Sequence, residues 1–102
     1  MKIFISASAE AELEESKLFY NRERKGLGDE FLDELESTFS FIEANPRILA
    51  VSRFNTRRCS LDRFPFTIVY RIDNEVIEVV AVAHQKRRPE YWKKRVKKNP
   101  KE

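Results

Sequence analysis

The sequence predicts a single α+β domain in which an antiparallel pair of helices packs on one face of a mostly antiparallel sheet. Hydrophobic residues recur with a helical period up to Pro46 and with a period of two after it. The 102 residues, 41% of them hydrophobic, supply apolar surface for one core but are too few for two. The strands expected after Pro46 are joined by short turns, which connect antiparallel neighbours. We therefore expect one domain over residues 1–102, in the order β-α-α-β-β-β with a short C-terminal helix.

The first expected elements are a short strand and a helix. Ile3-Phe4-Ile5 is rich in strand-forming side chains, and the serines that follow it can cap a helix. The helix is expected over about residues 8–25, where one stripe contains Ala9, Leu13, Ser16 and Tyr20. Its first turns are crowded with acidic residues, at the end where the helix dipole favours negative charge: Glu10, Glu12, Glu14 and Glu15.

The second helix shows the clearest periodicity in the chain. Gly26 fits the cap that ends the first helix, and Gly28 can open the second. One apolar stripe contains Leu27, Phe31, Leu35, Phe39 and Ile42. The acidic residues between positions 29 and 36 are most simply a solvated face. The helix is expected to end at Asn45, because a residue before proline avoids helical geometry. We expect the two helices to form a hairpin whose stripes face the strands.

Three strands are expected in the second half of the chain. Residues 57–61 and 64–72 are predicted strands, the second with alternating apolar and other side chains. Asp73-Asn74 forms the turn to residues 76–83, whose nearly continuous apolar pattern is typical of a central strand covered on both faces. Residues 48–54 fit either a strand or an extended connection. A short helix is expected around residues 89–97.

Charge divides the chain at Pro46. Residues 1–46 carry 5 Lys/Arg against 11 Asp/Glu, a net −6, whereas residues 47–102 carry 15 against 6, a net +9. So basic a region favours an acidic partner, either nucleic acid or an acidic protein segment. The chain ends in a basic tail of about residues 93–102. No apolar run approaches the ~20 residues of a membrane span, and we expect no membrane partner.

The cysteine, histidine and glycine content excludes several kinds of site. The single cysteine, Cys59, cannot form an internal disulfide, and the N-terminus does not resemble a signal peptide, so we expect a cytoplasmic protein. One His and one Cys cannot supply a zinc site. The two glycines lie between helices and not after a strand, unlike those of phosphate-binding loops. We expect neither a metal nor a cofactor.

An ordered set of motifs resembles the RelE/ParE toxin superfamily, and in particular ParE-type plasmid-stabilisation toxins. Arg63-Phe64-Pro65-Phe66 opens a basic strand with an F-P-aromatic sequence, and the next strand leads into H-x-x-R-x-P-x-x-W from His84 to Trp92. Three earlier groups also stand where that family has them: Ser8-Ala9-Glu10, Gly26-Leu27-Gly28 and Asn45-Pro46. The resemblance covers almost the whole chain and implies the same fold as the periodicity.

The resemblance implies the toxin of a type II toxin–antitoxin system, which inhibits growth and is neutralised when the extended C-terminal segment of an antitoxin wraps around it. ParE-like members poison DNA gyrase and are not nucleases, whereas RelE-like members cut messenger RNA in the decoding site of the ribosome. Our first interpretation is a ParE-like gyrase inhibitor that acts by binding. The alternatives are a RelE-like ribosome-dependent endoribonuclease and an inactive relative that only binds antitoxin.

The nuclease interpretation requires an acid, a base and cations around the scissile phosphate. His84, Arg87 and Tyr91 are the candidate catalytic residues, because imidazole exchanges protons near neutral pH and a guanidinium can hold a phosphate. RelE-like nucleases commonly carry an arginine just after the F-P-aromatic position, where this chain has Thr67. This departure favours the binding interpretation.

The candidate residues for binding the antitoxin or the target are basic, with one aromatic side chain. They are Arg57, Arg58, Arg63, Arg71, Arg88, Trp92, Lys93, Lys94 and Arg95. We expect a cleft beside the basic strands to accept the antitoxin, with Arg57, Arg58 and Arg71 contributing most. Trp92 could stack on a base, but we favour an anchor that docks the tail on the sheet. Cys59 with His84 could form a nucleophile pair, although a lone strand cysteine is usually buried.

Overall fold

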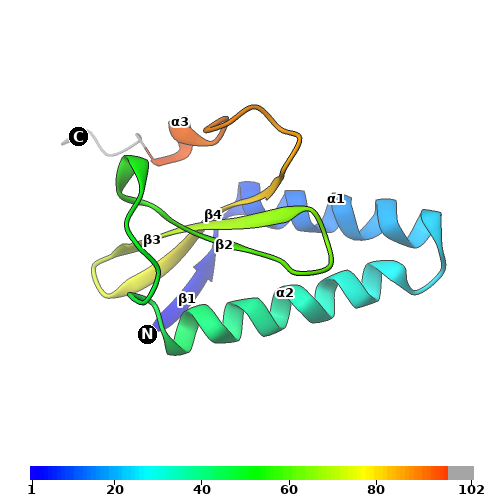
Figure 1. Cartoon of the computed structure of the whole chain (residues 1–102), viewed down its shortest axis with the longest axis horizontal. Coiled ribbons are helices and arrows are strands. Elements are labelled where there is room, and N and C mark those ends of the chain that lie inside the picture. Colours follow the sequence, from blue (N-terminus) through cyan, green and yellow to red (C-terminus); the bar gives the residue numbers. More distant parts are fainter. Residues whose placement is uncertain (97–102) are drawn as a thin grey trace.

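Four strands form one sheet in the order β1-β4-β3-β2 in the computed structural model, which describes residues 1–96 (Figure 1). The strands are β1 (Lys2–Ile5), β2 (Arg57–Ser60), β3 (Phe66–Asp73) and β4 (Val76–His84). β1 runs parallel to β4, and the other two pairs are antiparallel. The predicted mostly antiparallel sheet is confirmed, and its N-terminal strand lies beside the last strand of the chain.

The predicted helical hairpin is formed by α1 (Ala7–Glu23) and α2 (Leu27–Ala44). Ser6 caps α1, because its hydroxyl accepts a hydrogen bond of 3.2 Å from the backbone N–H of Ala9. Gly26 makes the turn between the helices with a φ of 88°, a conformation that suits glycine. At Gly28 the helices are so close that a Cβ atom would lie 2.3 Å from the carbonyl oxygen of Lys17.

The helices cover one face of the sheet and form the main core with it. Phe31 and Leu35 of α2 and Tyr70 of β3 are at most 1% exposed. Phe31 also packs against Phe64 and Phe66, with ring centroids 5.3 and 5.0 Å apart. The apolar stripe of the second helix therefore faces the strands as predicted.

The C-terminal segment, residues 85–96, lies against the opposite face of the sheet (Figure 1). It ends in the short helix α3 (Lys93–Val96). Trp92 is 3% exposed and packs in a second apolar cluster that includes Val69, Val80 and Ala81. β4 is thus covered on both faces, as its continuous apolar pattern predicts, and Trp92 anchors the segment.

β4 contains a bulge opposite β3. Val69 pairs with Ala81 and Tyr70 pairs with Val79, so Val80 has no direct partner on β3. Val80 and Ala81 consequently both belong to the cluster beneath the C-terminal segment. A bulge interrupts the ladder of backbone hydrogen bonds, so the polar groups around it need other partners.

The structure decides between the two forms considered for residues 48–54. They form a connection without a strand, and a 3-10 turn spans Arg53–Asn55, within which Phe54 has a φ of 59°. The last helix begins at Lys93 and not near residue 89, because Glu90, with a φ of 61°, cannot continue a right-handed helix. The remainder of the predicted basic tail, residues 97–102, lies outside the described residues.

We predict that Phe31→Ala lowers the free energy of unfolding by about 3–5 kcal/mol, because it leaves a cavity at a fully buried position. Phe41→Ala is the control on the same helix, where a side chain that is 41% exposed should cost less than about 1 kcal/mol. Urea unfolding followed by circular dichroism measures both changes. Equal effects would contradict the packing of this stripe against the sheet.

Candidate functional site

The carboxylate of Glu12 joins three parts of the molecule. Glu12 lies on α1, and its side chain is 15% exposed. Its Oε1 accepts hydrogen bonds of 3.0 Å from the backbone N–H of Val82 and from Nη1 of Arg95. Its Oε2 accepts bonds from the Tyr91 hydroxyl at 2.7 Å and from Nη2 of Arg95 at 3.0 Å. The carboxylate therefore links α1 to β4 and to the C-terminal segment.

Arginines enclose the ring of Tyr91 beside this carboxylate. The guanidinium carbon of Arg87 lies 3.8 Å from the ring centroid, and that of Arg95 lies 5.2 Å from it. Arg87 also forms an ion pair of 3.9 Å with Glu12. Burial raises the pKa of the Tyr91 phenol, and the hydrogen bond to Glu12 raises it further. The same carboxylate raises the pKa of the Arg95 guanidinium, so Tyr91 is held as a neutral donor and Arg95 as a cation.

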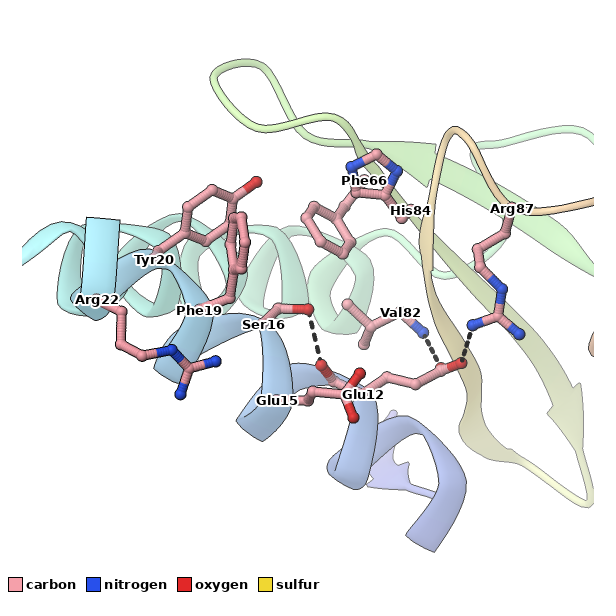
Figure 2. Close-up of a pocket in the computed structure, with 10 residues that line it drawn as sticks. All are labelled: Glu12, Glu15, Ser16, Phe19, Tyr20, Arg22, Phe66, Val82, His84 and Arg87. Carbon is pink, nitrogen blue, oxygen red and sulfur yellow. Dashed lines mark hydrogen bonds and ion pairs between the residues drawn. The ribbon is translucent and has the colours of Figure 1, made fainter. Parts of the chain in front are cut away.

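A groove of about 460 Å³ runs between α1 and the end of β4. Figure 2 shows Arg22 and Arg87 at its opposite ends, with Phe19 and Phe66 between them. Phe19 is 51% exposed, which is unusual for a phenylalanine in a small domain. The carboxylates of Glu12 and Glu15 also line the groove. The exposed ring of Phe19 and the guanidinium of Arg22 suit an amphipathic segment that combines apolar and acidic side chains.

His84 lies at the end of β4, where it also lines this groove. Its Nδ1 accepts a hydrogen bond of 3.0 Å from the backbone N–H of Lys86, so the proton of the neutral ring lies on Nε2. Its ring packs edge-on against Phe66 at 5.0 Å. A general base needs a free nitrogen lone pair, and the lone pair of Nδ1 is already occupied by Lys86.

A second hollow, of about 320 Å³, lies between the sheet and the C-terminal segment. Arg58, Arg88 and Trp92 line it, together with Thr67. The hydroxyl of Thr67 is 3.1 Å from that of Ser60. At the position that follows the F-P-aromatic sequence, this face thus has a pair of neutral hydroxyls.

Several predicted binding arginines have partners inside the chain. Nη1 of Arg57 donates to the carbonyl oxygens of Arg47 and Leu49, at 3.1 and 2.6 Å. Arg71 forms a partly buried ion pair of 2.7 Å with Glu78, its neighbour across the strands. These contacts fix Arg57 to the loop after α2 and Arg71 to the sheet.

The other predicted binding residues are distributed between the surface and internal contacts. Arg63 is exposed and pairs with Glu30 at 2.9 Å, whereas Arg58 lies over the ring of buried Trp92 at 5.6 Å. Three further predicted binding residues, all in the C-terminal segment, are exposed: Arg88, Lys93 and Lys94.

The thiol of Cys59 and the acidic side chains lack the features of a reactive or metal-binding site. Burial raises the pKa of the Cys59 thiol, and Asp62 raises it further, which disfavours the thiolate that a nucleophile requires. Within residues 1–96, no three His, Cys, Asp or Glu side chains are grouped so that they could hold a metal ion. In the same part of the chain, no helix combines the length and apolar composition needed to cross a membrane.

Sequence reasoning missed Glu12, Phe19 and Arg22. The helix dipole accounts for Glu12 as part of the acidic start of the helix, although this residue lies three positions after Ala9 and four before Ser16 and so falls on the buried stripe. That spacing was a usable signal. The exposure of Phe19 had no counterpart in the sequence pattern, because it depends on where β4 ends beside α1.

Comparisons with known proteins agree with this architecture. A family model described as the ParE toxin of the type II toxin–antitoxin system parDE matches residues 3–89. No curated protein matches the chain. A solved structure described as the chromosomal ParDE toxin–antitoxin system from P. aeruginosa superposes with a TM-score of 0.73 at 17% identity, over 82% of this chain and 95% of that chain. At this identity, the structural similarity shows the fold.

The helical hairpin on one side of a bulged sheet, with the C-terminal segment on the other, places the domain in the fold of ParDE toxin–antitoxin structures. The family-model match over residues 3–89 identifies the family as well as the fold. The chain belongs to the ParE toxin family of type II toxin–antitoxin systems.

We predict that stability falls as the pH rises above about 10. Burial raises the pKa of Tyr20, Tyr70 and Tyr91, so the unfolded chain loses phenolic protons before the folded chain does, and alkaline pH favours unfolding. Absorbance titration of the phenolate in native and denatured protein tests this, and Tyr91→Phe should lessen the loss. If the phenolate titration curves of the native and the denatured protein coincide, the contacts described for these rings are contradicted.

Proposed function

We propose that this chain is a toxin that inhibits DNA gyrase by binding to it, and that a cognate antitoxin neutralises it in the cytoplasm. The observation that carries this proposal is the engagement of Arg87 and Tyr91 with Glu12. Two of the three candidate catalytic side chains thereby have internal partners. The occupied lone pair of His84 and the hydroxyl of Thr67 also favour binding over RNA cleavage.

The surface of this face offers such a target several exposed cations. Arg58, Arg88, Lys93 and Lys94 are exposed on β2 and the C-terminal segment. A toxin that acts by surface contact distributes its binding energy over several side chains, so no single residue supplies chemistry. A nuclease depends instead on one acid or base for a factor of ~10² to 10⁴ in rate.

We predict that His84→Ala leaves inhibition of gyrase supercoiling largely intact, whereas Lys93→Ala combined with Lys94→Ala weakens it. The physical reason is that the lysines contribute small additive contacts and the imidazole contributes no proton transfer. Purified gyrase with relaxed plasmid measures supercoiling, and a translation reaction measures messenger-RNA cleavage in parallel. Cleavage that His84→Ala abolishes, with supercoiling unaltered, would favour the RelE-like alternative.

The groove beside α1 supports capture of an acidic, amphipathic antitoxin segment. Phe19 and Phe66 give an apolar floor, and Arg22 and Arg87 flank it. Because Arg57, Arg71 and Arg87 have internal partners, we place the main electrostatic contribution at Arg22. The antitoxin itself is expected to be encoded in the neighbouring reading frame.

We predict that Phe19→Ala weakens antitoxin binding by about 2 kcal/mol, the loss expected of a central aromatic anchor. Arg22→Ala should weaken binding less and should reduce its dependence on salt. Titration calorimetry at two salt concentrations measures both, and Phe41→Ala serves as a control because this exposed ring lies on α2 outside the groove. Equal losses for Phe19→Ala and Phe41→Ala would exclude the groove.

A further inference from the structure

We infer that Glu12 is a positioning residue that holds the C-terminal segment in the arrangement from which its cations contact the target of the toxin. The existence of a target rests on the proposed function, whereas the hold itself can be tested on the isolated protein. Glu12 is 15% exposed and negatively charged, beside cations that are exposed. It would therefore act through the segment and not by touching the target.

Three side chains of the segment converge on this carboxylate, whereas its other long-range hydrogen bonds are separate ones: the N–H of Gln85 donates to the carbonyl oxygen of Pro65 at 2.9 Å, and Nη1 of Arg71 donates to that of Val96 at 3.5 Å. The backbone hydrogen bonds from Arg87 to Arg95 are local ones, each made with a residue three positions earlier. By contrast, the side chains of Arg87, Tyr91 and Arg95 all reach Glu12. The ion pair between Arg53 and Glu90 also ties the segment down, but the arginine side chain is 71% exposed, so solvent weakens this contact.

The Glu12 carboxylate orients the C-terminal segment as well as attaching it. Its two oxygens accept hydrogen bonds of 3.0 Å from two nitrogens of Arg95, and such bidentate contacts set the orientation of the guanidinium. Nη1 of Arg95 also donates to the carbonyl oxygen of Val80 at 3.1 Å. Lys93 and Lys94 lie on the same turn of α3 as Arg95. The pairing of Arg95 with Glu12 therefore helps to orient the turn that carries them.

The attachment of the C-terminal segment by Glu12 is separate from the main core. Residues of the helical hairpin and of the facing strands form one apolar cluster, whereas Trp92 and Val96 belong to the other cluster, on the far side of the sheet. Loss of the Glu12 contacts should thus release the segment without unfolding the hairpin. Trp92 is the single tryptophan of the chain, and its burial at 3% exposure makes its fluorescence a specific reporter of the segment.

The test compares Glu12→Gln with Glu14→Gln in the full chain. Glutamine keeps the shape of glutamate but removes the charge, and Glu14 is an exposed residue of the same helix that lies outside the groove and the Glu12 contacts. Tyr91→Phe, which removes one donor and keeps the ring, provides a second variant in case Glu12→Gln does not fold. Circular dichroism checks folding, Trp92 emission and acrylamide quenching report the segment, and growth after induction reports toxicity.

For Glu12→Gln we expect native helical content, Trp92 emission shifted to longer wavelength, increased quenching and loss of growth inhibition. Tyr91→Phe should shift the same readouts less, and Glu14→Gln should match the wild type. The inference would be overturned if Glu12→Gln folds and keeps the Trp92 emission of the wild type. If Glu12→Gln does not fold, the same result for Tyr91→Phe would overturn it. A variant whose Trp92 emission reports release but which keeps full toxicity would also overturn it, as would a wild-type protein that does not inhibit growth. Toxicity without an effect on gyrase would contradict the proposed target alone.

Discussion

The arrangement of the molecule depends on one partly buried carboxylate, that of Glu12. An ion removed from water loses hydration energy, which is recovered only if good partners fill its lone pairs. Each oxygen of Glu12 accepts two hydrogen bonds, and together they engage Val82, Tyr91 and Arg95. Because these partners belong to β4 and the C-terminal segment while Glu12 belongs to α1, moving any one of the three parts leaves a polar group without its partner.

The length of β1 explains why β4 needs this side chain. β1 has four residues and β4 has nine, and their pairing ends at Val79. A strand edge without a neighbour exposes backbone groups that can pair with other chains. Here the N–H of Ser6 donates to the carbonyl oxygen of Val79, Arg95 donates to that of Val80, and the N–H of Val82 donates to Glu12. Side chains thus complete hydrogen bonding that a longer β1 would otherwise have provided.

The sequence predicts structure where interacting residues are close in the chain, as in the cap at Ser6 and the stripe of α2. It does not predict the Glu12 site, because the partners lie 70 to 83 residues further along, while the helix dipole already offers a local reason for an acidic start. Glu34 likewise fits a solvated helix face by its spacing, yet it accepts hydrogen bonds from the backbone N–H groups of Asp62 and Arg63. The parallel pairing of β1 with β4 joins distant segments in the same way, so strand order was not predictable.

The opposite charges of the two halves are partly neutralised inside the molecule. Acidic residues of the helices pair with later arginines, Glu12 with Arg95 and Glu30 with Arg63. The cations left exposed on β2 and the C-terminal segment include Arg58, Arg88, Lys93 and Lys94. A diffuse net charge attracts any acidic molecule, but it does not orient one. Cations on a segment fixed by a partly buried anion occupy defined positions, so an acidic surface can be recognised by its geometry as well as by its charge.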